Sequence, residues 1–422
     1  MHHRIARCLA LLLLPILSGC GEVESPPSDD TVVESDAPEE ITAFMGARLF
    51  DGTGSPVVED GVVLVRDGII AAVGTRADVP VPDGAERVDL SGTFLMPGLI
   101  NAHGHVGAGG DRSDVGEQLE IYAHYGVTTV QSLGDEADDR REERWSADLE
   151  RARLFVSGPS LNPGSPEEAR SEVERVREMG ADWVKMHVNA ARGREFFTAV
   201  IEAAHEVGLP AAIHIEELED ARNVLDAGAD LLAHSVRDEP VDDDLMERMR
   251  DTEVCLTPTF TRELSTYVYA DRPAFFDDPF FLERAAPDDL DDFLTPQRQA
   301  QAESGSARYW RDALPLAKAN MMRLHEEGAG IAMGTDSGPS GRFQGYFEHL
   351  ELEMMVEAGM TPTDALVSAT GGAARCLGLA GRVGTLEAGV HADFLVLDGD
   401  PTVDILQTRA IHGVWIAGNR IR

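Results

Sequence analysis

The middle of the chain alternates short apolar segments with helical stretches eight times over about 240 residues, a length typical of a single barrel. Helices are expected, for instance, at 165–179, 194–207 and 313–327. The expected strands lie near 99–103, 128–133, 154–157, 183–187, 211–215, 231–235, 254–258 and 331–335. This alternation predicts an α/β fold with a closed parallel (β/α)8 TIM barrel. A doubly wound open sheet is the alternative, but no Gly-rich phosphate-binding turn follows any strand.

Both ends of the folded part are rich in short strands separated by turn residues. We therefore expect one small β-sandwich built from 41–96 and 379–422, flanking a barrel over 97–378. Within the barrel, the interval 260–310 follows the seventh strand and holds ten of the 25 aromatic residues. An aromatic loop of this length at the carboxyl end of a strand is expected to form a lid-like insertion over the site.

The first 40 residues have the pattern of an export signal and a tether. Arg4 and Arg7 precede a short apolar core, which is too short to span a membrane. The core ends in Leu-Ser-Gly-Cys at 17–20, which resembles a bacterial lipobox. We predict a signal peptide at 1–19, a lipid anchor on Cys20 and a disordered tether over 20–40. The expected location is an exported lipoprotein on the periplasmic side of the inner or outer membrane.

The net charge restricts the classes of partner, and the cysteine positions bear on disulfide bonding. A formal net charge of −39 argues against nucleic acid and anionic membrane surfaces as partners. A small-molecule or dipeptide substrate is expected, and a homo-oligomer stays open. In the folded part, Cys255 and Cys376 lie far apart in sequence, so buried thiols are expected rather than a disulfide.

Six residues that can bind or support a metal fall near the carboxyl ends of predicted strands, where barrels place reactive groups. They are His103, His105, Lys185, His214, His234 and Asp336. His103 and His105 share one face of a strand because side chains alternate. Lys185 is the most informative, since it lies inside an apolar strand and the chain has only one other lysine, Lys318. Taken singly, the later histidines could be core residues and Asp336 a helix cap.

Four segments together resemble the amidohydrolase superfamily, in its imidazolonepropionase-like and prolidase-like branch of metal-dependent hydrolases. They are PGLINAHGH at 97–105, YGVTTV at 125–130, GTDS at 334–337 and GTLEAGVHADFLVLD at 384–398. The resemblance extends over about residues 42 to 422 and implies two divalent metal ions, expected to be zinc. It implies that His103, His105 and Asp336 hold one ion and that His214 and His234 hold the other. Lys185, carboxylated by CO2 to a carbamate, would bridge them.

The same resemblance implies an enzyme that cleaves amide (C–N) bonds with a metal-bridging hydroxide. Asp336 would act as general base and then general acid. Expected substrates are dipeptides, as for a prolidase, or small N-acyl amides. Residues considered for substrate contact are Tyr267, Tyr269, His187 and Glu217, although packing in the core or the insertion is the alternative for both tyrosines.

Two other activities stay open, and a third alternative is disfavoured. Asn101 stands where many family members have Asp, and Glu217 follows His214 at the spacing used by one-metal deaminases of cyclic amidines or nucleobases. A lactone or ester hydrolase is a further alternative. Lys185 favours the two-metal amide hydrolase, because a deaminase does not need it. A metal-free binding lipoprotein is disfavoured because the ligand set is complete.

Overall fold

The computed structural model describes residues 40–107, 115–134, 141–188, 193–285 and 290–422. The predicted signal peptide, the lipid anchor on Cys20 and nearly all of the tether therefore lie outside the described residues. In the described part of the chain, none of the helices combines the length and the apolar character that crossing a bilayer requires.

Eight parallel strands form two sheets, in the order in which they occur along the chain. The first sheet contains β7 (Leu99–Gly104), β8 (Val127–Gly134) and β9 (Arg153–Pro159). The second contains β10 (Val184–His187), β11 (Ala211–His214), β12 (Leu231–Ala233), β13 (Cys255–Thr257) and β14 (Gly330–Ile331). Each corresponds to one of the eight strands predicted from the sequence, so the parallel α/β architecture is confirmed.

Backbone hydrogen bonds also connect the outer edges of these two sheets. The amide of Ala102 donates to the Met333 carbonyl at 2.8 Å, next to β7 and β14. The amide of Leu161 donates to the Lys185 carbonyl at 2.8 Å, next to β9 and β10. Because these contacts lie outside the assigned ladders, full closure of the barrel stays a prediction.

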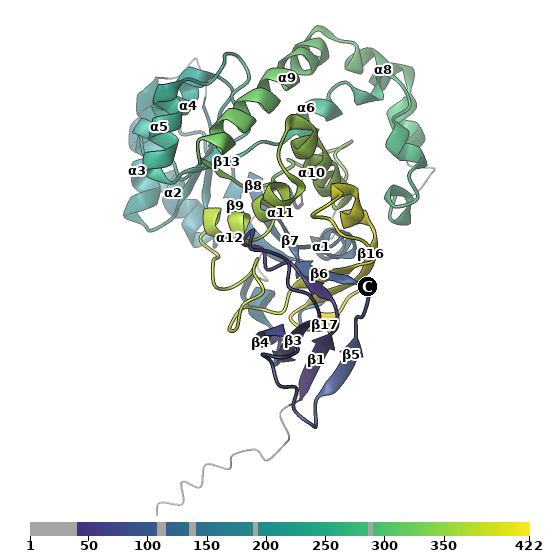
Figure 1. Ribbon diagram of the computed structural model, residues 1–422. Helices are drawn as coiled ribbons and strands as arrows, with labels where there is room; N and C mark the ends of the chain where they lie inside the picture. The colour runs from purple at the N-terminus through teal and green to yellow at the C-terminus, as the bar shows by residue number, and fades with distance from the viewer. Residues whose placement is uncertain (1–39, 108–114, 135–140, 189–192, 286–289) are drawn as a thin grey trace, which may run out of the picture. The chain divides into compact units, whose positions relative to one another are not determined.

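Amphipathic helices cover the strands, as the alternating pattern predicts. Helices α2 (Ala169–Glu178), α3 (Arg194–Glu206), α4 (Leu218–Asp226) and α5 (Asp243–Thr252) pack in sequence beside one another (Figure 1). In α3, Phe197, Val200, Ile201 and Ala204 are buried at helical spacing, which turns one face toward the core. The remaining helices of this part are α1 (Val115–His124), α9 (Gly305–Glu326), α10 (Tyr346–Ala358), α11 (Pro362–Ser368) and α12 (Gly371–Cys376).

Strands from the two ends of the chain pair with each other. One sheet contains only early strands: β1 (Ile41–Met45), β3 (Gly61–Arg66), β4 (Ile69–Thr75) and β5 (Glu86–Asp89). The other joins early and late strands: β2 (Arg48–Leu49), β6 (Phe94–Pro97), β15 (Phe394–Leu397), β16 (Ile411–Ile416) and β17 (Asn419–Arg420). Phe44 packs edge-on against Phe394 and Trp415, so residues of both sheets share one apolar cluster. The sandwich and its boundaries stay a prediction.

The aromatic interval folds over its own apolar cluster. Its described residues contain α6 (Phe260–Ser265), α8 (Pro296–Ala302), the first residues of α9 and four short 3-10 turns, η3 (Val268–Ala270), η4 (Ala274–Asp277), η5 (Phe281–Glu283) and η6 (Asp291–Leu294). Tyr269, Phe276 and Phe281 are buried together with Tyr346 and Phe347 of α10. Aromatic packing, rather than long regular helices, therefore holds the interval in place.

The expectation of two separate thiols is wrong. Cys255 of β13 and Cys376 of α12 form a disulfide, with Cα atoms 5.7 Å apart. The two residues are 121 positions apart in sequence, but Cys255 belongs to an apolar cluster with Ile100, Ala332 and Ala373, and Cys376 packs against this cluster. Helix α12 packs against β7 and β14, next to the start of β13. Because the two cysteines lie far apart in the sequence, their proximity in the fold could not be predicted from it.

Candidate metal centre

Three of the predicted ligands converge at the carboxyl ends of the strands. Ligand atoms of His103, His234 and Asp336 lie within 4.8 Å of one another, and all three side chains are buried. His103 belongs to β7, whereas His234 and Asp336 come directly after β12 and a few residues after β14. His234 (φ +77°) and Asp336 (φ +57°) both adopt the left-handed conformation, which is costly for residues other than glycine. The backbone therefore departs from extended strand geometry at His234 and Asp336.

Two further predicted ligands extend the cluster. The Nε2 atom of His105 is 2.7 Å from Oδ1 of Asp336. The ring of His214, at the end of β11, is 4.4 Å from the ring of His234, measured between centroids. The ring of His103 lies 4.6 Å from the ring of His234, again between centroids. Imidazoles from strands far apart in sequence therefore share one polar centre.

Lys185 is buried on β10, beside β11, with 1% of its surface exposed. Its charge lowers the pKa values of His103, His187, His214 and His234, after the larger effect of burial on each. The ammonium group therefore lies close to the histidine cluster. A buried cation among metal ligands is electrostatically unfavourable, whereas a carbamate on the same nitrogen would be an anion with two ligand oxygens.

Hydroxyl groups orient two of the histidines. Nδ1 of His103 lies 3.3 Å from the Thr257 hydroxyl, and Nδ1 of His234 lies 2.6 Å from the Thr259 hydroxyl. Each hydrogen bond leaves Nε2 as the nitrogen available to a ligand. Such bonds fix the tautomer and orientation of metal-binding imidazoles.

A buried network around Asn101 supports the loop that carries Asp336. The Asn101 Oδ1 atom accepts from the His103 amide at 2.9 Å, and its Nδ2 atom donates to Oε1 of Glu348 at 2.6 Å. The same Glu348 oxygen accepts from the hydroxyls of Thr335 and Ser337 at 2.8 and 2.7 Å. Asn101 thus acts as both acceptor and donor where an aspartate could only accept, unless it were protonated.

Electrostatics keep the candidate ligands in the protonation state that a metal requires. Burial lowers the pKa values of His103 and His234 well below the usual range, and burial together with the charge of Lys185 lowers that of His214 to about 2. Burial alone would raise the pKa of Asp336, but the charges of Arg342 and His105 hold it well below its ordinary value. Neutral imidazoles and an ionised carboxylate result.

The donor set fits divalent cations. Nδ1 of His214 is buried and has no hydrogen-bond partner among the described residues, so its lone pair is free to bind a cation when it is unprotonated. Four imidazoles, one carboxylate and a lysine that CO2 can carboxylate provide the nitrogen and oxygen ligands that zinc and similar ions prefer.

The residues considered for substrate contact have different positions. The His187 ring lies 4.5 Å from that of His214, and its Nδ1 atom is 2.8 Å from the Ser160 hydroxyl, so it borders the centre. Tyr269 is buried, and its hydroxyl donates to the Gly341 carbonyl at 2.5 Å. Tyr267 is half-buried against the main core. Glu217 is exposed at the start of α4.

A group of arginines beside the centre was not predicted from the sequence. The guanidinium groups of Arg262 and Arg237 lie over the ring of Trp310, at 4.1 and 4.9 Å from its centroid. Buried Arg237 also pairs with Glu263 at 3.3 Å, and Arg342 forms an ion pair with Oδ2 of Asp336. The only local signal was the proximity of Arg237 to His234 in the sequence, and arginine is otherwise the ordinary cation of this chain.

Comparison with known proteins agrees with this geometry. The model of the amidohydrolase family matches residues 94–421. An imidazolonepropionase of Deinococcus radiodurans is 28% identical over 392 residues, which cover 86% of this chain and 93% of that protein. An imidazolonepropionase of Pseudomonas aeruginosa is 28% identical over 411 residues, covering 88% and 94% of the two chains.

Solved structures give the same result for the fold. A "putative prolidase" from Bifidobacterium longum is 25% identical, with a TM-score of 0.73 over 90% of this chain and 94% of that one. A Xaa-Pro dipeptidase with bound methionine is 21% identical, with a TM-score of 0.71 over 90% and 99% of the two chains. The fold is therefore TIM-barrel-like. The family match covers most of the chain, which is a metal-dependent hydrolase acting on C–N bonds and belongs to the amidohydrolase family.

Proposed function

We propose that this protein is an exported, lipid-anchored hydrolase that uses two metal ions to cleave amide bonds in dipeptides or small N-acyl compounds. The observation that carries the proposal is the convergence of His103, His234 and Asp336 with three further predicted ligands around one buried centre. The prolidase-like and dipeptidase neighbours support the substrate class.

The proposed ligand sets come from the resemblance to the superfamily, and the structure adds that His103, His234 and Asp336 lie in one cluster. His103, His105 and Asp336 would hold one ion, His214 and His234 the other, and carboxylated Lys185 would join them. When bound, the ions would supply Lewis acidity, which polarises the amide carbonyl and makes water acidic enough to react near neutral pH. Zinc suits this combination of imidazole and oxygen ligands.

Asp336 is the proposed proton carrier. One carboxylate oxygen lies beside His105 and the other beside Arg342, so the side chain is held in place from both sides. It would take the proton of the attacking water and then donate it to the leaving nitrogen. Proton donation to nitrogen matters because an amide anion is a poor leaving group.

The deaminase alternative receives no support from the position of Glu217. That reading needs its carboxyl group near the reacting ring, but the side chain is exposed at the start of α4. A library of dipeptides and N-acyl amino acids, assayed for free amino acids beside an ammonia assay, tests the reaction class. Amino acids released without ammonia are expected, and ammonia alone would overturn the proposal.

Substitution of Lys185 tests the metal centre, and Lys318 offers a matched control because it is the only other lysine and pairs with Glu357 on the surface side of α9. We expect about two ions per chain in the wild type and in Lys318→Ala, and at most one in Lys185→Ala. Amide hydrolysis should fall by roughly 100-fold or more in Lys185→Ala and stay unchanged in Lys318→Ala, because loss of even a supporting group at a metal site costs about 10- to 100-fold in activity. Two ions retained without Lys185 would contradict a bridging carbamate.

A further inference from the structure

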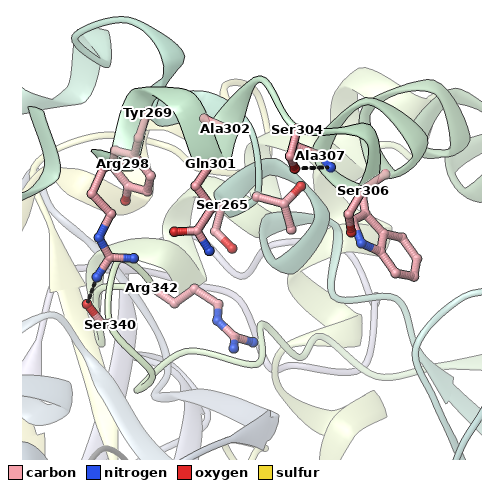
Figure 2. A pocket seen from close by; sticks show the side chains of 12 residues that line it. Ser265, Tyr269, Arg298, Gln301, Ala302, Ser304, Ser306, Ala307, Ser340 and Arg342 are labelled. Atoms are coloured by element: carbon pink, nitrogen blue, oxygen red, sulfur yellow. Dashed lines mark hydrogen bonds between the residues drawn. The ribbon is translucent and has the colours of Figure 1, made fainter. Parts of the chain in front are cut away.

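A cavity of about 250 Å³ lies between the aromatic interval and the loop that follows Asp336. Figure 2 shows Arg298 and Gln301 of α8 and Arg342 of that loop around it, with Ser265 of α6 nearby. The rings of Tyr269 and Trp310 also contribute to the lining. The cavity is small for a ligand site, so it suits one part of a substrate rather than a whole extended molecule.

The charge of this cavity is opposite to that of the protein. The chain has 75 acidic and 36 basic residues, yet the described residues that line the cavity include two arginines and no carboxylate. Arg298 donates from Nη2 to the Ser340 hydroxyl at 3.0 Å and has no acidic side chain within 4.0 Å in the described part of the chain. Its charge is therefore not neutralised by a neighbouring acid.

The cavity adjoins the metal centre through Arg342. This residue lines the cavity and also forms the ion pair with Asp336, so the two spaces are one arginine side chain apart. Trp310 makes a second connection, since it lines the cavity and stacks on Arg262 and Arg237. A group held here would belong to a molecule whose other part reaches the metal ligands.

We propose that Arg298 and Arg342 bind a carboxylate of the substrate in this cavity, so that the enzyme acts on amides bearing a free carboxylate rather than on neutral amides. A planar guanidinium binds a carboxylate through two parallel hydrogen bonds, and the side-chain amide of Gln301 supplies a further donor. The aromatic rings provide an apolar wall for the carbon atoms beside the carboxylate. This inference specifies the substrate of the proposed function and rests on it.

Binding of benzoate and benzamide to the metal-loaded protein tests the proposal without requiring turnover. The two probes have nearly the same size, but only benzoate is charged. We expect benzoate to bind at least tenfold more tightly than benzamide, and Arg298→Met to weaken benzoate binding at least tenfold. Arg298→Lys, which keeps the charge but not the planar fork, should retain part of the affinity.

Arg272→Met is the matched control. Arg272 belongs to the same interval and lies over the ring of Phe276, but it pairs with Asp277 and does not line the cavity. It should leave benzoate binding unchanged. Because both methionine variants keep the metal ligands, benzoate bound directly to metal would give equal affinities in the two, and that result would overturn the proposal, as would equal binding of benzoate and benzamide.

A kinetic comparison separates this inference from the proposed function. The ratio of kcat/KM for an N-acyl amino acid over its carboxamide should be large in the wild type and fall at least tenfold in Arg298→Met. Hydrolysis of both compounds at equal rates would overturn the carboxylate site but keep the amide hydrolase. If neither were hydrolysed, the proposed function would fail, whereas the binding experiment would still decide whether the cavity takes a carboxylate.

Discussion

Single residues in the centre are prepared for a cation by their surroundings. Burial favours the neutral form of His103, His214 and His234, and hydrogen bonds between Nδ1 and threonine hydroxyls orient His103 and His234. Neutral histidines do not have to lose a proton before they bind a metal. The cost is that the centre resists protonation, which makes the metal-free protein sensitive to acid.

Acid sensitivity of the metal-free protein is the first prediction at this scale. The folded-state pKa of His214 is lowered to about 2 from an ordinary value of 6.5, so its contribution to stability is present above pH 6.5 and is lost as the pH falls below it. Each such histidine should reduce the free energy of unfolding by about 1.4 kcal/mol per pH unit below 6.5. Urea denaturation of chelator-treated protein at pH 7.5, 6.5 and 5.5 measures this slope. His214→Gln removes one titrating group, so the slope should fall by about 1.4 kcal/mol per pH unit. Equal slopes in both proteins would contradict the lowered pKa of His214.

Asn101 gives the second prediction. In Asn101→Asp, the Nδ2 donor to Glu348 is replaced by a carboxylate oxygen, which places two buried carboxyl groups against each other. We expect a loss of about 1–3 kcal/mol in the free energy of unfolding, typical of a broken buried hydrogen bond. Denaturation of metal-loaded protein measures it, with the partly exposed Asn223→Asp as a control that should change stability little. An unchanged stability would show that Glu348 takes up a proton and restores the bond.

At the scale of elements, the sequence predicts what is local and misses what depends on distant contacts. The eight strands coincide with apolar segments of the right length. Helix α11 begins at a local capping signal, where the Thr361 hydroxyl accepts from the Asp364 amide at 3.1 Å. The six ligand candidates were predicted because the carboxyl ends of parallel strands meet at one edge of a barrel. Glu348 and Arg342 could not be assigned, because nothing in their own segments shows that they approach residues such as Asn101 or Asp336.

A buried ion pair joins β9 to the C-terminal strands. Arg153 donates to both carboxylate oxygens of Asp393 at 2.6 and 2.8 Å, and both side chains are buried. We expect Asp393→Leu to cost about 3–5 kcal/mol in the free energy of unfolding, because it leaves a buried guanidinium without its partner. The double variant Arg153→Leu/Asp393→Leu should recover part of this loss. Asp60→Asn, in the exposed pair with Arg76, serves as the control and should have little effect. A small loss in Asp393→Leu would mean that water reaches Arg153.

At the scale of the whole molecule, the disulfide and the proposed export are mutually consistent. Disulfides form in oxidising compartments and are rare in reducing ones. The Cys255–Cys376 bond lies in the described fold, whereas the predicted lipobox at Cys20 lies outside it, so the two observations are independent. The disulfide thus supports the exported location proposed from the first 20 residues.

The last prediction concerns this bond and its compartment. Cys376→Ser opens a covalent loop of 121 residues and should lower the free energy of unfolding by roughly 4–5 kcal/mol, because the disulfide no longer restricts the unfolded chain. Denaturation with and without a reducing agent measures it: reduction should destabilise the wild type but not Cys376→Ser. Protein recovered from the cell envelope should contain no free thiol at Cys255 or Cys376. Cys20→Ala should abolish labelling by a radioactive fatty acid while the disulfide persists. Free thiols in envelope-bound protein would contradict the pairing, and unchanged labelling of Cys20→Ala would contradict the anchor, so the two proposals fail separately.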